Sequence, residues 1–151
     1  MLSDLIGGFG PVQVAAGQTV SLTAAGTGSP PFTYQWRRNA VPVVNGPTGS
    51  GSTFSGATTF NLVIVNTRPS DAGTYTCLVT NPCGVQATSA ARTLTVFCAA
   101  DFNHDGAVNV QDIFDFLSAW FANLPAANFN GVGGINVQDI FDFLAAWFGP
   151  C

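Results

Sequence analysis

The loop between residues 101 and 112 carries oxygen-bearing side chains at a spacing that can bind a hard cation. It reads Asp-Phe-Asn-His-Asp-Gly-Ala-Val-Asn-Val-Gln-Asp, so side-chain oxygens fall at positions 1, 3, 5, 9 and 12. A glycine stands at position 6, where a calcium loop turns sharply, and the carbonyl of position 7 adds another oxygen. The pattern predicts a Ca²⁺ site whose ligands are Asp101, Asn103, Asp105, Ala107, Asn109 and Asp112.

The loop is followed by a block of sequence that occurs twice. The twelve residues from Val110 return 27 residues later from Val137, with the single change of Ser118 to Ala145. Such an internal repeat predicts two similar helices, each beginning directly after its loop. The large apolar residues of the block cover more than one stripe of a helix, and a unit of about 50 residues hides only about 60% of its chain surface. We therefore expect some of these side chains to face a partner.

The second loop, residues 128–139, is poorer in ligands. Asparagine replaces aspartate at position 1, valine without a side-chain oxygen stands at position 5, and only position 12 keeps a carboxylate. Because cation attraction falls with the number of carboxylates, we expect this loop to be empty or to bind weakly. Its remaining oxygen ligands would be Asn128, Asn130, Gly134, Asn136 and Asp139.

The charges of the chain are few and unevenly placed. Only 8% of the residues are charged, against roughly 25% in an average soluble protein. Residues 1–100 hold four arginines and two aspartates, whereas residues 101–151 hold six aspartates and no Lys or Arg. This acidic part argues against nucleic-acid binding, and no apolar run reaches the roughly 18 residues of a membrane span. The chain has no Glu or Lys, and its single His lies inside the first loop. It therefore has no set of a nucleophile, a general base and a residue to orient the base, and we expect that it is not an enzyme.

Residues 11–97 consist of short alternating runs separated by Gly, Pro, Ser and Asn. A period of two is typical of half-buried strands, and repeated runs of this kind predict an all-β sandwich. Residues 45–57 are rich in Gly, Ser and Thr, so we expect a long loop there that is mobile or contacts a partner, with a plain linker as the alternative. Residues 1–10 are apolar and short, and they predict an edge strand or an addition to a neighbour's sheet. The six runs are residues 12–14, 20–24, 32–37, 59–65, 73–79 and 91–96.

The sandwich resembles an immunoglobulin-like domain of the bacterial cell-surface type. The residues that carry the resemblance occur in the family's order: Trp36, then Leu62, then the D-x-G-x-Y-x-C pattern from Asp71 to Cys77. The resemblance implies that Trp36 is a core residue. It also implies that Tyr75 closes a corner of the fold with a hydrogen bond.

The four cysteines do not form the close pairs typical of metal sites, and they predict two disulfides and an oxidising, extracellular setting. The immunoglobulin pattern has its other cysteine where this chain has Ala24, so the resemblance implies a bridge from Cys77 to Cys83 across a hairpin. Two free thiols are the alternative. A bridge from Cys98 to Cys151 would clasp both ends of the C-terminal part and restrict the unfolded chain by about 4 kcal/mol. Pairing of Cys83 with Cys98 is its rival.

The C-terminal part, residues 98–151, resembles the dockerin module of bacterial cell-surface and cellulosome proteins, in the form found on secreted planctomycete-type proteins. The loop with aspartate at position 12, the repeat and the helix ends in Trp-Phe carry this resemblance. It implies a pair of calcium loop–helix repeats that docks onto a cohesin-like partner, with either copy able to bind after a half-turn. A repeat kept only for the core between the helices is the alternative. The partner-binding residues would be Val110, Gln111, Phe114, Val137, Gln138 and Phe141.

The sequence thus predicts a mainly β chain with a small α module. Its parts are an N-terminal segment, residues 1–10; an immunoglobulin-like β-sandwich, residues 11–97; and a dockerin-like calcium-binding module, residues 98–151. The predicted role is non-catalytic anchoring or adhesion by a secreted or cell-surface protein, with the immunoglobulin-like domain as a spacer or binding module. A subunit of a self-assembling extracellular fibre is the alternative, because parts of opposite charge permit self-association in head-to-tail contacts that do not close.

Overall fold

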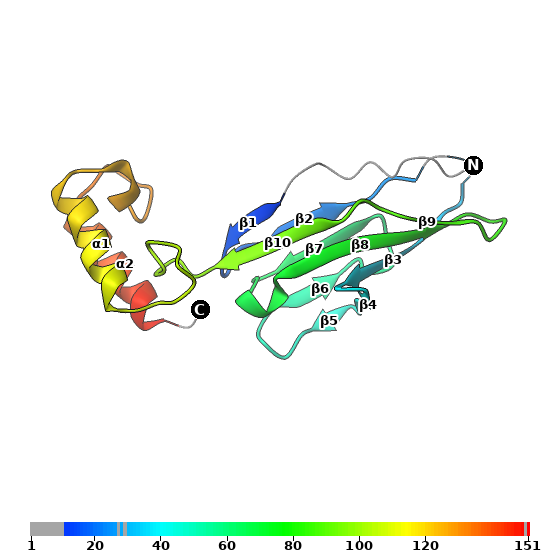
Figure 1. Ribbon diagram of the computed structural model, residues 1–151, viewed down its shortest axis with the longest axis horizontal. Helices are drawn as coiled ribbons and strands as arrows, with labels where there is room; N and C mark the ends of the chain where they lie inside the picture. Colours follow the sequence, from blue (N-terminus) through cyan, green and yellow to red (C-terminus); the bar gives the residue numbers. More distant parts are fainter. Residues whose placement is uncertain (1–10, 27, 29, 150) are drawn as a thin grey trace. The chain divides into compact units, whose positions relative to one another are not determined.

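The computed structural model describes residues 11–26, 28, 30–149 and 151. The chain forms two compact units, Met1–Val96 and Phe97–Cys151, the first built from strands and the second from helices (Figure 1). The expected edge strand at residues 1–10 lies outside the described residues. Among the helices of the described part, none has the length and apolar character needed to cross a membrane.

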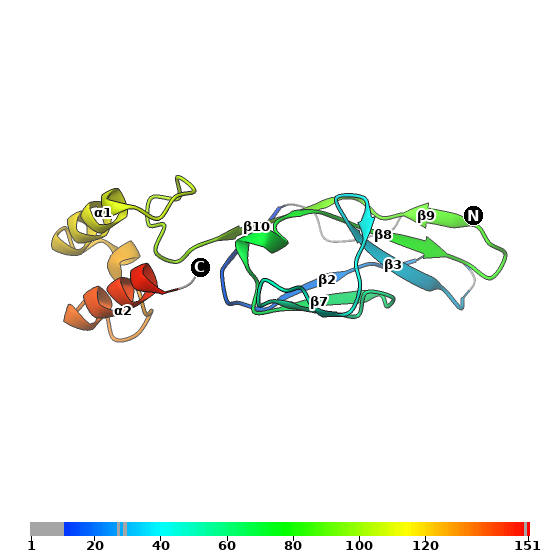
Figure 2. The ribbon, with the colours of Figure 1, turned by 90° about the horizontal axis from the view of Figure 1, so that it is seen from below.

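The first unit is a sandwich of two sheets, which Figure 2 shows as separate layers. One sheet has the strand order β1-β10-β8-β3-β4, with β9 paired to β8, and the other has the order β2-β7-β6-β5. The strands are β1 (Val12–Ala15), β2 (Val20–Thr23), β3 (Thr33–Arg38), β4 (Val41–Pro42), β5 (Gly46–Pro47), β6 (Thr53–Ser55), β7 (Asn61–Val65), β8 (Gly73–Thr80), β9 (Gln86–Thr88) and β10 (Arg92–Phe97).

Alternation along the strands places one face of each sheet in the core. In β8, Tyr75, Cys77 and Val79 are buried, as expected for a strand with one face on a core. Trp36 of β3 lies opposite Cys77, is buried, and donates its indole Nε1–H to the carbonyl of Thr59 at 2.9 Å. The expectation of a core tryptophan is confirmed.

The corner before β8 has the expected hydrogen bond. The hydroxyl of Tyr75 donates to the carbonyl oxygen of Asp71 at 2.7 Å, and burial raises the pKa of this phenol to about 12. The buried carboxylate of Asp71 accepts the N–H of Arg68 at 2.8 Å and the hydroxyl of Ser52 at 2.9 Å. Its negative charge lies 3.6 Å from the guanidinium of Arg38. The buried carboxylate of Asp71 therefore has hydrogen-bond donors and a positively charged neighbour.

Residues 45–57 contain two short strands, β5 and β6, where a long loop was predicted. Here β5 pairs with β6, with Gly46 opposite Phe54, and both Phe54 and Ala57 are buried in the core. A two-residue and a three-residue strand are too short to produce a visible alternation, and only one large apolar residue marks them. The prediction of a long loop is therefore wrong.

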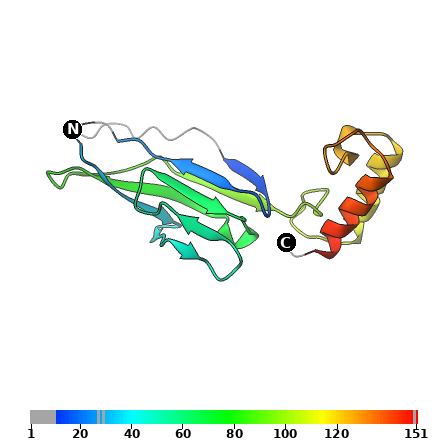
Figure 3. The same cartoon turned by 180° about the vertical axis from the view of Figure 1, so that it is seen from behind.

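The second unit contains two helices of equal length, which lie beside each other in Figure 2 and one behind the other in Figures 1 and 3. Each begins directly after its loop, as predicted, because each starts with a capping box. At the first helix the side chain of Asn109 accepts the N–H of Gln111, while the carboxylate of Asp112 accepts the N–H of Asn109 at 2.8 Å. The elements are α1 (Val110–Phe121), the single turn η2 (Pro125–Ala127) and α2 (Val137–Phe148).

Four phenylalanines form the core between the helices. The rings of Phe116 and Phe143 are stacked, with centroids 4.3 Å apart and planes within 1°. Phe102 meets Phe116 edge-on at 5.5 Å, and Phe129 meets Phe143 edge-on at the same distance. Residues 27 positions apart thus occupy equivalent places, so the unit has approximate twofold symmetry.

The two repeats form a ring. Counted with the offset of 27, the first repeat covers residues 98–124 and the second covers residues 125–151. The peptide bond from Leu124 to Pro125 joins the end of the first repeat to the start of the second. The disulfide from Cys151 to Cys98 joins the end of the second to the start of the first. The disulfide therefore occupies the place that a peptide bond occupies at the other junction.

Candidate functional site

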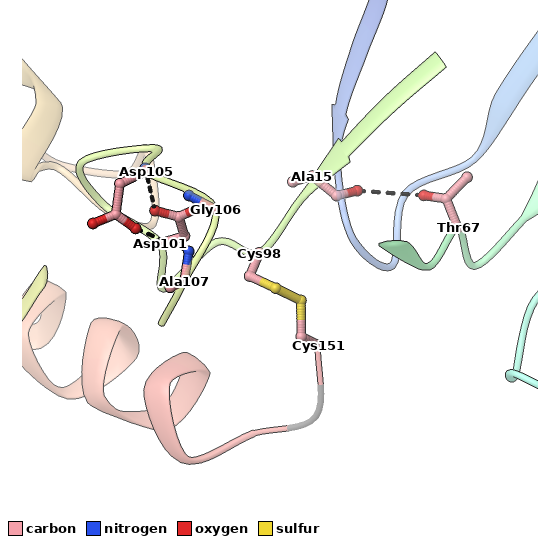
Figure 4. Close-up of a disulfide and its surroundings, with 8 residues drawn as sticks. All are labelled: Ala15, Thr67, Cys98, Asp101, Asp105, Gly106, Ala107 and Cys151. Atoms are coloured by element: carbon pink, nitrogen blue, oxygen red, sulfur yellow. Dashed lines mark hydrogen bonds between the residues drawn. A yellow bond between two sulfur atoms is a disulfide. The ribbon is translucent and has the colours of Figure 1, made fainter. Parts of the chain in front are cut away.

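The first loop is folded around its own carboxylates. Asp101 is only 4% exposed, and its oxygens accept the N–H groups of Asp105 at 3.1 Å and Gly106 at 3.0 Å (Figure 4). A carboxylate oxygen of Asp105 accepts the N–H of Ala107 at 2.9 Å, and the amide oxygen of Asn103 accepts the N–H of Asp105 at 2.9 Å. These bonds hold four of the six predicted ligand residues in one tight turn.

Asp112 connects the start of the loop to the helix. It is fully buried, and one of its oxygens accepts the N–H groups of Phe102 at 2.9 Å and Asn103 at 3.2 Å. The other oxygen accepts the N–H of Asn109, whose side-chain amide in turn donates to the carbonyl of Ala107 at 3.2 Å. Asp112 therefore acts as a helix cap in addition to its predicted role as a ligand.

The donor set of the first loop fits a hard cation. Residues 97–151 contain no Lys or Arg, so the buried charges of Asp101 and Asp112 have neither kind of basic side chain in their unit, unlike Asp71, which has Arg38. Buried carboxylates are normally paired with a positive group or coordinate a metal. Across the described residues, no three His, Cys, Asp or Glu side chains gather into a ready metal centre. A cation would therefore have to draw Asp101, Asp105 and Asp112 together.

The second loop lacks the charges of the first. Asn128 takes the place of Asp101, and its side-chain oxygen is buried and accepts no hydrogen bond from any described residue. Val132 takes the place of Asp105 and offers no side-chain oxygen. The two carboxylates that close the first turn are therefore missing from this loop, and the prediction that it is empty or binds weakly rests on this difference.

The second loop keeps the part of the arrangement that begins the helix. Asp139 is fully buried and accepts the N–H groups of Asn130 at 3.3 Å and Asn136 at 2.8 Å. The side-chain amide of Asn136 donates to the carbonyl of Gly134 at 2.8 Å, as Asn109 does in the first loop. The helix cap is therefore common to both repeats, whereas the carboxylates at loop positions 1 and 5 occur only in the first.

Both helices carry an apolar stripe that faces away from the phenylalanine core. On α1 the sequence positions of this stripe place it on the side opposite Phe116, and α2 repeats it opposite Phe143. Phe121 and Phe148, at the helix ends, are 78% and 79% exposed. Four of the predicted partner-binding residues belong to the stripes, whose exposed members are Val110, Phe114, Phe121, Val137, Phe141 and Phe148.

The two predicted contact glutamines bond within their own helices. The side chain of Gln111 donates to Asp115 at 2.9 Å, and that of Gln138 donates to Asp142 at 3.0 Å. The bond from Gln138, followed by one from Asn130, lowers the pKa of the Asp142 carboxyl. Both glutamines are exposed, so a partner would meet them already held in place.

The cysteines confirm one predicted bridge and contradict the other. Cys98 and Cys151 form a disulfide, with Cα atoms 5.4 Å apart, next to the first loop (Figure 4). Cys77 and Cys83 are free thiols, so the predicted bridge between them is wrong. Cys77 points into the sandwich core from the middle of β8, and Cys83 lies exposed beyond the end of that strand. Burial raises the pKa of the Cys77 thiol to about 11.

The sequence did not point to the hydrogen bonds of two tryptophans. The indole Nε1–H of Trp120 donates to the carbonyl of Asn136 at 3.0 Å, and that of Trp147 donates to the carbonyl of Asn109 at 3.5 Å. Each tryptophan of one repeat thus reaches the helix start of the other. Their equivalent positions in the repeat were the only available signal.

Comparison with known proteins identifies the fold of the first unit. Residues 9–81 match the immunoglobulin domain family. The chain is 38% identical over 73 residues to hemicentin-1 of Mus musculus, covering 48% of this chain and 1% of that protein. It is 41% identical over 68 residues to contactin-2 of Homo sapiens, covering 44% and 6% of the two chains. It is 38% identical over 81 residues to the cell adhesion molecule DSCAM of Gallus gallus, covering 54% and 4%. The chain therefore carries an immunoglobulin-like domain and spans a small fraction of these relatives.

Solved structures show similar domains. The tandem Ig repeats of Dlar share 28% identity at a TM-score of 0.48, covering 61% of this chain and 47% of that one. The titin M3 domain shares 27% identity at a TM-score of 0.45, covering 57% and 86% of the two chains.

Proposed function

We propose that the chain belongs to a secreted or cell-surface protein with a non-catalytic role in anchoring or adhesion. Its second unit is a dockerin-like module, stabilised by calcium, that docks onto a protein partner. Its immunoglobulin-like domain serves as a spacer or as a binding module in its own right. The similarity to hemicentin-1, contactin-2 and the cell adhesion molecule DSCAM supports the adhesive and extracellular part of this proposal.

The observation that carries the docking role is the apolar stripe repeated on both helices. Large exposed apolar groups on a monomer mark interaction sites when they lie together. The stripe is not needed for the core, because Phe116 and Phe143 fill the space between the helices from the other side. The surrounding unit is acidic and holds no Lys or Arg, so the partner that fits is an apolar surface with a basic rim.

Calcium supports the docking surface by stabilising the first loop. When bound, it would neutralise Asp101, Asp105 and Asp112, which otherwise repel one another. Ala107 and the asparagines of the loop offer uncharged oxygens beside them. A cation that binds only the folded loop stabilises the folded unit by mass action. The second loop, with one carboxylate, contributes little to this effect.

A chelator tests this proposal directly. The chain would be melted, and used to capture partners from a cell-envelope extract, in calcium and then in excess EDTA. We expect EDTA to lower the melting temperature of the helical unit and to abolish partner capture. The variant with Phe114→Ser and Phe141→Ser should lose capture and keep its calcium-dependent melting. Identical melting and capture in both buffers would refute the proposal.

The distribution of charge supports a second role, as a subunit of an extracellular fibre. Residues 1–100 carry four arginines against two aspartates, and residues 101–151 carry six aspartates without Lys or Arg. Opposite charges on two parts of one chain favour head-to-tail contact between copies, which extends into filaments when it does not close. Electron microscopy at high protein concentration and low salt tests this role. Discrete monomers in every field would exclude it.

A further inference from the structure

The two tryptophan bonds of the second unit are equivalent in sequence and unequal in length. Trp120, in the last turn of α1, reaches the carbonyl of Asn136 at 3.0 Å, and Trp147, in the last turn of α2, reaches that of Asn109 at 3.5 Å. The donor and acceptor residues are the same in both pairs, so residue type does not explain the difference. The longer bond belongs to the loop that carries three carboxylates.

Asn109 is bonded directly to two predicted ligand residues of that loop. Its backbone N–H donates to Asp112 at 2.8 Å, and its side-chain amide donates to the carbonyl of Ala107 at 3.2 Å. A shift of these groups toward a cation would therefore move the carbonyl of Asn109, to which Trp147 donates.

The end of α2 is tied to the first loop at a second point. The disulfide joins Cys151 to Cys98, three residues before Asp101. The last turn of α2, which carries the exposed Phe148, therefore lies between two attachments to the first loop. The end of α1, with Phe121, is attached to the second loop in the equivalent way, through the peptide chain and through Trp120.

We propose that a cation in the first loop acts on the docking stripe of the other repeat, through Trp147. By drawing the three carboxylates together, it shortens the bond from Trp147 to Asn109 and fixes the end of α2 with Phe148. The stripe of α1 ends beside the second loop, which has one carboxylate and binds calcium weakly or not at all. Calcium therefore does not fix the end of α1. The two stripes have the same residue types, yet calcium fixes the position of only the stripe on α2. This inference rests on the proposed calcium site and names its regulation.

The test compares Trp147→Phe with its matched control Trp120→Phe in the full chain. Calcium chloride alone is titrated into each protein by calorimetry. Because the hydrogen bond that shortens and strengthens when the ion binds is removed, we expect calcium binding to weaken by up to about fivefold in Trp147→Phe. The Trp120→Phe variant should bind within about twofold of the unchanged chain, because its bond does not depend on the ion. Melting in EDTA checks that both variants fold, and the loss of stability in Trp147→Phe should be no larger than that in Trp120→Phe, because its bond is the longer one without the ion.

Nuclear magnetic resonance of the indole N–H groups provides a readout that packing alone does not move. The chain has three tryptophans, Trp36 in the first unit and the two in the second, and the variants assign their signals. On adding calcium, the signal of Trp147 should shift downfield as its bond shortens. The signals of Trp120 and Trp36 should move less.

The outcomes separate this inference from the proposed function. Calcium binding with equal losses in both variants, or with equal shifts of Trp147 and Trp120, would overturn the inference and leave the calcium site standing. No heat and no shift on adding calcium would overturn the calcium site, and the inference with it.

Discussion

The two repeats of the second unit share a helix and differ in a loop. The helices are identical at eleven of twelve positions, and their phenylalanines meet across an approximate twofold axis. Each helix is part of the other's core, because Phe116 and Phe143 stack on each other. The second loop has Asn128 and Val132 where the first has Asp101 and Asp105, and the helix after each loop is capped in the same way. The packing of the phenylalanines therefore joins the two repeats, whereas the number of loop carboxylates distinguishes them.

Opening the ring at the disulfide should have the largest effect. Replacing Cys98 and Cys151 by serine frees a loop of 54 residues in the unfolded state, which costs about 4 kcal/mol of stability in the entropy model. Circular dichroism of the helical signal during urea unfolding measures the loss. An unchanged midpoint would mean that the peptide junction alone holds the two repeats together.

Removing one ring of the central stack tests whether the helices are energetically equivalent. Phe116→Ala and Phe143→Ala should each destabilise the unit by about 3 kcal/mol, because each leaves a cavity between the same two helices. Urea unfolding followed at the helical signal compares them. Costs that differ by more than about 1 kcal/mol would break the symmetry that the ring contacts indicate.

Exchanging the loop charges tests the difference between the repeats. Asn128→Asp with Val132→Asp gives the second loop the carboxylates of the first, and we expect calorimetry to count one additional calcium ion per chain. At a free calcium concentration a hundred times its Kd, this ion should stabilise the unit by about 2.7 kcal/mol. The reverse variant, Asp101→Asn with Asp105→Val, should lose the ion from the first loop. Unchanged stoichiometry in both variants would show that these carboxylates do not decide occupancy.

The smallest expected effect concerns the pH dependence of the second repeat. Hydrogen bonds from Gln138 and Asn130 lower the folded-state pKa of Asp142. The stability they contribute is therefore present above the unfolded pKa of about 4, and it is lost as the pH falls through the folded value. Gln138→Ala should move the pKa of Asp142 back toward its ordinary value, as measured by carbon-detected titration. An unchanged pKa would show that these bonds do not persist in solution.

Part of this fold was predictable because local patterns coincide with the final contacts. The alternation in β8 matches its buried face, and the two capped helices begin where their Asn and Asp residues lie. The strands of residues 45–57 could not be predicted, because their order comes from pairing with β7 and from the burial of Phe54. The free thiols of Cys77 and Cys83 likewise follow from the direction of β8, which a cysteine count cannot provide.

The difference in oxygen-bearing residues between the two loops was determined by the sequence alone, since residue type and spacing within twelve residues are local properties. Only the tertiary structure decided which contacts the two helices make and which of their side chains are exposed. It brought Trp147 to Asn109, turned Phe121 and Phe148 outward, and closed the ring between Cys98 and Cys151. These contacts join residues that lie far apart in the chain, so local sequence patterns do not predict them. Which side chains meet between the two helices depends on how the helices pack.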